Sequence, residues 1–109
     1  MKDPTVWGAL QALLDEPGSD HTVESLATSV GMSRSAFAQR FTEAYGSGPI
    51  ELLRDLRIRQ AGVLLRDSDL PVKRIARTVG FASRTAFSRM FEKKTGVSPS
   101  DFRSATRAG

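Results

Sequence analysis

The sequence contains one helical pattern twice. Residues 23–41 read VESLATSVGMSRSAFAQRF and residues 72–91 read VKRIARTVGFASRTAFSRMF, so that apolar and glycine positions recur about 50 residues apart, with one extra residue in the second copy. In each copy a glycine separates two stretches with apolar residues at helical spacing. The repeat therefore predicts a duplicated helix-turn-helix.

Turn and capping residues divide the chain into seven expected helices. Thr22, Ser33 and Ser83 stand at expected N-caps, and Gly46 and Gly96 stand where helices should end. The helices cover approximately residues 5–15, 23–30, 34–45, 50–66, 72–79 and 84–95, and a last one begins at a capping box in residues 98–101. The predicted fold class is all-α, with a first helix-turn-helix subdomain in residues 1–49, a long central helix in 50–66 and a second subdomain in 67–109.

The apolar positions that the two copies share are expected to pack the two helices of each pair together. They are Leu26, Ala27, Val30, Phe37 and Phe41 in the first copy, and Ile75, Ala76, Val79, Phe87 and Phe91 in the second. In the first helix the apolar stripe is assigned to Val6, Leu10, Leu13 and Leu14. Trp7 is expected to cover the first and central helices, and His21 is expected to lie on the surface.

The composition argues against several functional classes. The chain has no cysteine and one histidine, and its glycines stand at expected turns and helix ends, so that neither a nucleophile with its base, nor a metal cluster, nor a phosphate-binding glycine loop is evident. We therefore expect no enzymatic activity, no catalytic residue, no metal and no cofactor. No apolar run approaches the roughly 18 residues that span a bilayer, and the start of the chain does not resemble a signal peptide. A cytoplasmic protein that binds no membrane is expected.

Charge is distributed unevenly along the chain. The formal net charge is +4; residues 1–50 hold three basic and six acidic residues, which gives −3, and residues 51–109 hold thirteen and six, which gives +7. A concentrated basic region favours phosphate backbones, because each neutralised phosphate releases condensed counterions. A solvated charged face is the alternative on charge alone.

The outer face of the second helix in each copy carries side chains that suit the edges of DNA bases. These positions are Arg34, Ser35, Ala38 and Gln39 in the first copy, and Arg84, Thr85, Ser88 and Arg89 in the second. Arginine pairs with guanine, glutamine with adenine, serine and threonine with several bases, and an alanine methyl group contacts thymine. For a single helix, the alternative is an ordinary exposed face. The recurrence of these side chains at matching positions in both copies disfavours that alternative.

These residues resemble a known family. Residues 71–103 read PVKRIARTVGFASRTAFSRMFEKKTGVSPSDFR, which resembles the signature of the AraC/XylS family of bacterial transcription regulators: I-A-x-x-x-G-F, an aromatic residue and F-x-R-x-F, then G-x-S-P-x-x-[FY]-R. The resemblance extends from about Val6 to Arg103. It implies two helix-turn-helix units joined by a long central helix, with two recognition helices in successive major grooves on one face of promoter DNA.

The resemblance also assigns roles by matching position. It implies base contacts for Ser35, Ala38, Gln39, Arg84, Thr85, Ser88 and Arg89, and phosphate contacts are expected for Arg34, Ser83, Lys94 and Arg103. Because Ser35 and Ala38 are small, we expect Gln39 to carry most of the readout by the first unit. The basic second unit should supply more of the affinity. Two unlike half-sites, bound in a single orientation, follow from these differences.

The length of the central helix is compatible with this arrangement. A helix of about 16 residues is roughly 24 Å long, and the flanking helices bring the expected separation of the recognition helices near the roughly 34 Å between adjacent major grooves.

The expected partners are double-stranded promoter DNA and RNA polymerase, and the expected role is a nucleoid-associated transcription activator. The domain alone is expected to be monomeric, as a C-terminal part of a regulator that dimerises through a separate sensing domain.

One alternative belongs to a different class. A helical protein-protein interaction module, without direct readout of DNA, would share the same fold and much of the same composition. Salt dependence separates the two hypotheses, because affinity for duplex DNA falls steeply with salt.

Overall fold

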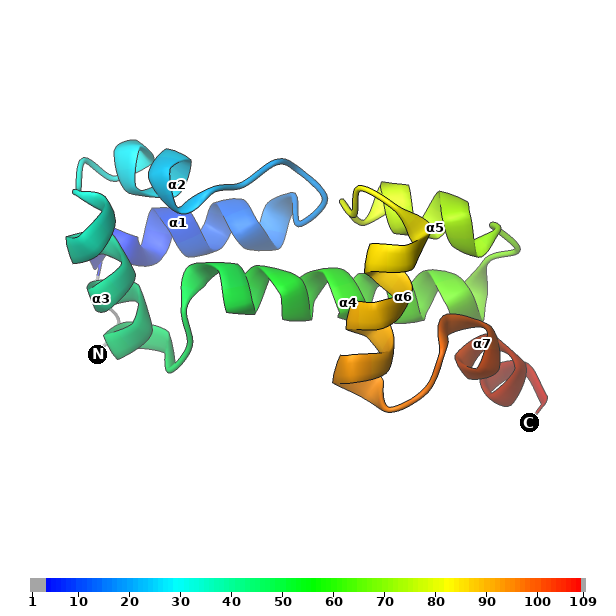
Figure 1. The fold of residues 1–109 in the computed structure, drawn as a ribbon. Helices are drawn as coiled ribbons and strands as arrows, with labels where there is room; N and C mark the ends of the chain where they lie inside the picture. The colour runs from blue at the N-terminus through cyan, green and yellow to red at the C-terminus, as the bar shows by residue number, and fades with distance from the viewer. Residues whose placement is uncertain (1–3, 109) are drawn as a thin grey trace. The chain divides into compact units, whose positions relative to one another are not determined.

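The computed structural model describes residues 4–108, which form seven helices and no strand (Figure 1). The helices are α1 (Pro4–Asp15), α2 (Val23–Ser29), α3 (Arg34–Tyr45), α4 (Pro49–Asp67), α5 (Val72–Thr78), α6 (Arg84–Thr95) and α7 (Pro99–Ala108). The predicted all-α fold is confirmed, and the helix boundaries differ from the expected ones by only a residue or two at most ends. The last helix, for which only the start was predicted, extends beyond Phe102 to Ala108.

The chain divides into two compact units within α4. Unit 1 ends at Leu56 and unit 2 begins at Arg57. Leu53, in the first half of α4, belongs to the core of unit 1, whereas Ile58 and Leu65 belong to the core of unit 2. The two halves of the central helix are thus parts of the two cores. The sequence-based boundaries at residues 49 and 66 had instead treated the whole helix as a linker between two subdomains.

The core of unit 1 is formed by α1, α2, α3 and the first half of α4. Val6, Ala9 and Leu13 are completely buried and lie on one face of α1, at i, i+3 and i+7. The expected stripe was wrong in one residue: Leu14 is 48% exposed, because it is turned by about 100° around the helix from Leu13. Trp7 is 37% exposed.

The apolar positions that the two copies share are more completely buried in unit 2 than in unit 1. Ile75, Ala76, Val79, Phe87 and Phe91 are all fully buried, as expected. Helix α7 contributes the ring of Phe102, whose centroid lies 5.3 Å from that of Phe91 in an edge-on arrangement. In unit 1, Val30 was expected in the core but is only partly buried, because it lies at the margin of the cluster, beside Gly8 of α1.

The expected caps set the start and end of the helices in both units. The hydroxyl groups of Thr22, Ser33 and Ser83 accept hydrogen bonds from the backbone N–H three residues ahead, at 3.0, 3.2 and 3.1 Å. Gly46 and Gly96 end α3 and α6 in the left-handed region, with φ of 80° and 85°. Helices α3 and α6 therefore have the same length and the same start relative to their phenylalanines.

Candidate nucleic-acid interface

Helices α3 and α6 present matching faces to solvent. In each helix the two phenylalanines are buried, whereas the first two residues of the helix and the position midway between the phenylalanines are exposed. Exposure agrees position by position: Arg34, Ser35 and Gln39 are exposed and Ala38 is half-buried in α3, while Arg84, Thr85 and Arg89 are exposed and Ser88 is half-buried in α6. Each unit thus brings its predicted base-contacting residues together on one accessible helix face.

In unit 1, two of these residues are held by carboxylates of the same unit. Arg34 Nη1 lies 3.2 Å from Oε1 of Glu24, which stands in the first turn of α2. Gln39 Nε2 donates to Oε1 of Glu43, one turn further along α3, at 3.2 Å. The largest polar groups on the face of α3 are therefore engaged within the unit.

Unit 2 has lysines where unit 1 has these carboxylates. In the repeat, Lys73 of α5 corresponds to Glu24 and Lys93 of α6 corresponds to Glu43. Within residues 4–108, the side chains of Arg84 and Arg89 have no hydrogen bond or ion pair. The face of α6 therefore presents two uncommitted guanidinium groups, which a phosphate or the edge of a guanine can engage.

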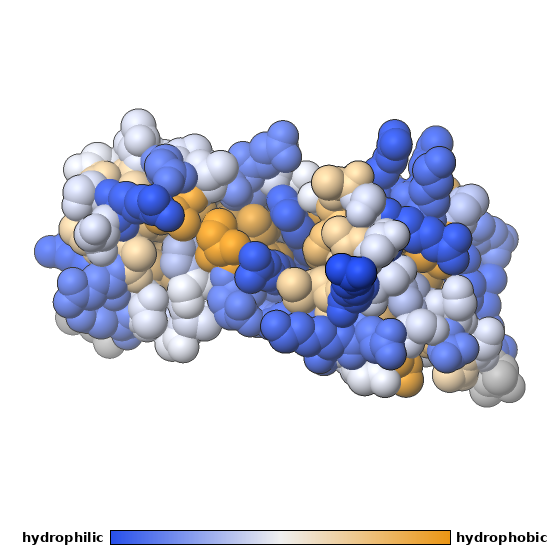
Figure 2. All heavy atoms as spheres, viewed as in Figure 1, coloured by the Kyte–Doolittle hydropathy of each residue, from blue (hydrophilic) through white to orange (hydrophobic). Residues whose placement is uncertain are grey.

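Helix α5 adds a cluster of cations that the sequence analysis missed. Lys73, Arg74 and Arg77 lie opposite the buried face of α5 and line, with Pro71, an open hollow of about 360 Å³. None of these three side chains has a polar partner in the part of the chain that the structure describes. On the face of the molecule that Figure 2 shows, hydrophilic side chains lie over the α5 region. The i, i+1, i+4 spacing of the three cations in the sequence already indicates one basic helix face. The prediction did not include them because the first copy has no basic residue at the corresponding positions.

The remaining predicted phosphate-contacting residues differ in their surroundings. Ser83 is exposed at the start of α6, where its hydroxyl oxygen accepts the N–H of Ala86, so that its own proton is available to a further acceptor. Lys94 is half-buried in the last turn of α6. Arg34 is the first residue of α3 and Ser83 is the N-cap of α6, and the backbone N–H groups at a helix start also favour anions.

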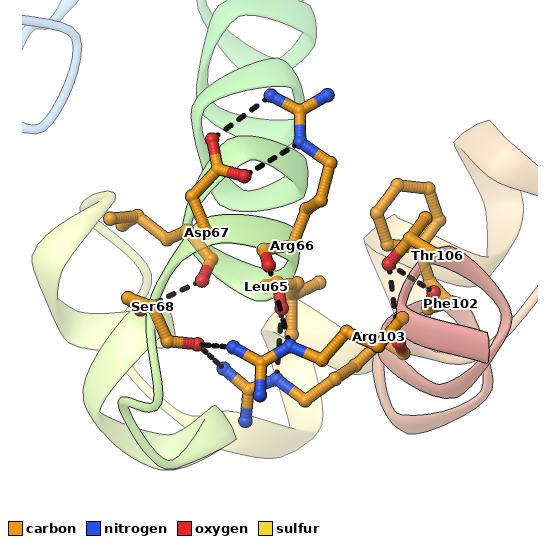
Figure 3. Close-up of polar contacts among 9 residues, drawn as sticks. Leu65, Arg66, Asp67, Ser68, Phe102, Arg103 and Thr106 are labelled. Carbon is orange, nitrogen blue, oxygen red and sulfur yellow. Dashed lines mark hydrogen bonds and ion pairs between the residues drawn. The ribbon is translucent and has the colours of Figure 1, made fainter. Parts of the chain in front are cut away.

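Arg103 is engaged at the C-terminal end of α4 (Figure 3). Its Nε donates to the carbonyl of Leu65 at 3.0 Å, and its Nη2 donates to those of Ser68 and Leu70 at 3.1 and 2.7 Å. Arg103 thus has a structural role that competes with its predicted phosphate contact, as a link between α7 and the end of α4.

Arg107 extends this link by one helical turn. It donates to the carbonyls of Arg66 and Ser68 and, at 2.8 Å, to Oδ1 of Asp69. The hydrogen bond and charge of Arg107 lower the pKa of Asp69 below its usual value. The two arginines thus satisfy the carbonyl groups of Leu65 and Arg66, which the end of α4 leaves without intrahelical partners, and carbonyl groups of the segment that follows the helix.

Other kinds of site find little support in the described residues. Within residues 4–108, no group of three histidine, cysteine, aspartate or glutamate residues could hold a metal ion. No helix in the same range is both long and apolar enough to cross a membrane. His21, expected on the surface, is partly exposed, and its Nε2 lies 2.7 Å from the carbonyl of Glu16.

Comparison with known proteins gives consistent matches over nearly the whole chain. A family model described as a helix-turn-helix domain matches residues 26–105. The RCS-specific HTH-type transcriptional activator RclR of Escherichia coli is 38% identical over 104 residues, which are 95% of this chain and 37% of that protein. A putative AraC-like transcription regulator of Streptomyces antibioticus is 38% identical over 103 residues, 94% of this chain and 34% of that protein. The chain thus spans about a third of the length of these relatives.

Solved structures agree with these matches. The DNA-binding domain of AdpA, a global transcriptional factor whose structure was determined in complex with a target DNA, is 36% identical, with a TM-score of 0.91 over 98% of this chain and 96% of that one. The C-terminal domain of AraT, a response regulator from Geobacillus stearothermophilus, is 33% identical, with a TM-score of 0.89 over 94% of this chain and 86% of that one.

Proposed function

The chain belongs to the AraC family of DNA-binding transcription regulators, and we propose that it recognises an asymmetric promoter site through α3 and α6. The observation that carries this proposal is the matching pair of exposed helix faces with unlike side chains. Both faces begin at a serine N-cap and stand on the same two buried phenylalanines. The alternative of a protein-protein module without DNA readout is not favoured, since the AdpA domain that the chain resembles was solved with its target DNA.

The two units should contribute differently to recognition. On α6, Arg84 and Arg89 are free to pair bidentately with guanine, and the hydroxyl groups of Thr85 and Ser88 can reach neighbouring base edges. On α3 the predicted base-contacting residues are Ser35, Ala38 and Gln39. Gln39 is the only one of the three with a large side chain. We expect two different half-sites in successive major grooves.

The phosphate-contacting set is proposed to be broader than the sequence suggested. Arg34, Ser83 and Lys94 remain candidates at the ends of the recognition helices. Lys73, Arg74 and Arg77 join them, because the first helix of a helix-turn-helix crosses the DNA backbone and this exposed face of α5 is basic. These contacts would position unit 2 without reading sequence.

The role in transcription rests on the relatives. RclR is named as a transcriptional activator, and we propose that this chain likewise serves an activator that acts on RNA polymerase in the bacterial cytoplasm, at the nucleoid. The domain itself is proposed to bind DNA as a monomer, with any dimerisation supplied by a separate sensing domain, because its two units already provide two reading elements.

Site selection from random duplexes tests the proposed function directly. The purified chain should enrich one non-palindromic sequence with two conserved blocks. Binding of this duplex, followed by fluorescence anisotropy, should weaken steeply with salt, with a log–log slope of about −0.9 for each phosphate contacted. A failure to enrich any sequence, together with salt-independent binding, would contradict the proposal and favour the protein-protein module.

A further inference from the structure

We propose that Glu24 and Glu43 oppose DNA binding by unit 1, because they occupy the groups that would otherwise contact DNA. This inference rests on the proposed function and concerns how the affinity is divided between the two units. Both carboxylates lie beside the predicted interface, and neither belongs to the set of base- or phosphate-contacting residues.

Both carboxylates contact side chains of the predicted interface. Glu24 pairs with Arg34 at 3.2 Å, across the turn between α2 and α3. Glu43 accepts a hydrogen bond from Gln39 at 3.2 Å. The side chains of Glu24 and Arg34 are 61% and 69% exposed, so that DNA can reach them. For Arg34 to bind a phosphate, or Gln39 a base, each must give up its internal contact.

The fold of a helix pair does not require these carboxylates, because unit 2 forms the same pair without them. Lys73 and Lys93 occupy the corresponding positions, yet α5 and α6 have the same lengths as α2 and α3. The cores of the two units use the same pair of phenylalanines. The carboxylates are therefore a difference of the surface, and not a condition for forming the helix pair.

The two carboxylates also act electrostatically. A carboxylate next to the recognition face repels the phosphates that flank a major groove, and it also neutralises the cation that would attract them. An exposed ion pair is weak, so each internal contact should reduce affinity only modestly. Unit 2, with lysines at both positions, would then supply most of the electrostatic attraction. Unit 1 would add affinity only where its half-site makes good contacts.

Neutral substitutions test this inference. Glu24→Gln and Glu43→Gln should each tighten binding to the selected full-length site by about two- to fivefold. Glu24→Gln should also make the log–log salt slope steeper by about 0.9, because the released Arg34 gains a phosphate. Binding would be measured by fluorescence anisotropy over a series of salt concentrations, with thermal unfolding of each variant as a check on the fold.

Two controls separate a local effect from a general change of charge. Asp15→Asn removes the same charge at an exposed position on α1, away from both contacts, and should not alter affinity or slope. A duplex that carries only the second half-site should bind the wild type and the glutamine variants equally. If the two glutamine variants match Asp15→Asn, or if they tighten both duplexes equally, the inference is wrong.

A third variant covers a loss of stability in α2. Glu24 also stands in the first turn of α2, where a negative charge favours the helix. Glu24→Asp keeps that charge but shortens the side chain, so it should weaken the contact with Arg34 and still steepen the salt slope. An unchanged slope in a folded Glu24→Asp variant contradicts the inference. If the wild type itself binds no duplex, the proposed function fails instead.

Discussion

Arg89 and Gln39 occupy the same position on the two recognition helices, but their surroundings differ. Gln39 is hydrogen-bonded to Glu43, whereas Arg89 has no polar partner within residues 4–108. A guanidinium group without a competing partner can be used fully in a bidentate contact with guanine. We therefore expect the contribution of each proposed base-reading residue to depend on the side chain one turn further along the same helix.

Substitution of Arg89 should therefore affect sequence-specific binding in particular. We expect Arg89→Ala to weaken binding to the selected site by about 1–3 kcal/mol and to relax the base preference at one position of the second half-site. Binding to random duplexes should change much less. Anisotropy titrations with both duplexes measure the difference, and equal losses on the two would remove Arg89 from the base-reading set.

Among single residues, the sequence predicted which positions of the two helices are exposed better than it predicted the polar contacts that they make. The exposed positions of α3 and α6 follow from their spacing to the buried phenylalanines. Partners such as Glu24 for Arg34 were not predicted, because their contact depends on the angle between two helices. Arg103 is the clearest case: its hydrogen-bond acceptors lie 33 to 38 residues away in the sequence.

Helix α7 is held to the end of α4 by Arg103, and this link can be tested separately from DNA binding. Arg103→Ala should lower the free energy of unfolding by about 1.5–3 kcal/mol, because half-buried carbonyl groups lose a charged donor. Arg103→Lys should recover only part of this loss, since an ammonium group cannot reproduce the planar arrangement of donors. Chemical denaturation measures both variants.

The same variants decide between the two roles of Arg103. If it mainly links α7 to α4, the Arg103→Ala protein should keep the salt slope of the wild type at temperatures where it is folded. A slope that is shallower by about 0.9 in a variant of undiminished stability would instead support the predicted phosphate contact.

Helix α5 should act as a phosphate-contacting element of unit 2. We expect the triple variant Lys73→Ala, Arg74→Ala, Arg77→Ala to reduce the salt slope by about 0.9 for each phosphate that it no longer binds, and to weaken specific and random duplexes similarly. The three side chains are exposed and make no polar contacts in the described chain, so the fold should survive. Salt-dependent anisotropy measures the slope.

Arg66 provides a control of equal charge for the α5 cations. Its guanidinium group is already bound to Asp67, at 2.8 and 3.0 Å, so Arg66→Ala should leave the slope unchanged, whereas Arg77→Ala should reduce it. If the triple variant keeps the wild-type slope, the basic face of α5 does not contact DNA and is available to an acidic protein surface.

The chain as a whole shows what a repeat in sequence can and cannot predict. It predicted two helix pairs of equal length, and the serine caps and glycine ends gave their boundaries. It did not predict that the compact units would divide inside α4, because the apolar residues of that helix follow one continuous pattern, and only packing assigns Leu53 and Ile58 to different cores.

Because the units occur in a fixed order in one chain and carry unlike faces, binding should have a direction. A duplex in which the two selected half-sites exchange places, with the same composition and spacing, should lose most of the specific affinity. Each mismatched base pair costs about 1–3 kcal/mol, and several mismatches remove an advantage of about 4–10 kcal/mol over random DNA. Competition titrations measure this loss, and analytical ultracentrifugation should show one protein per duplex. Equal affinity for both orders would mean that one unit reads no sequence, and the most direct explanation would be that α3 contacts only the DNA backbone.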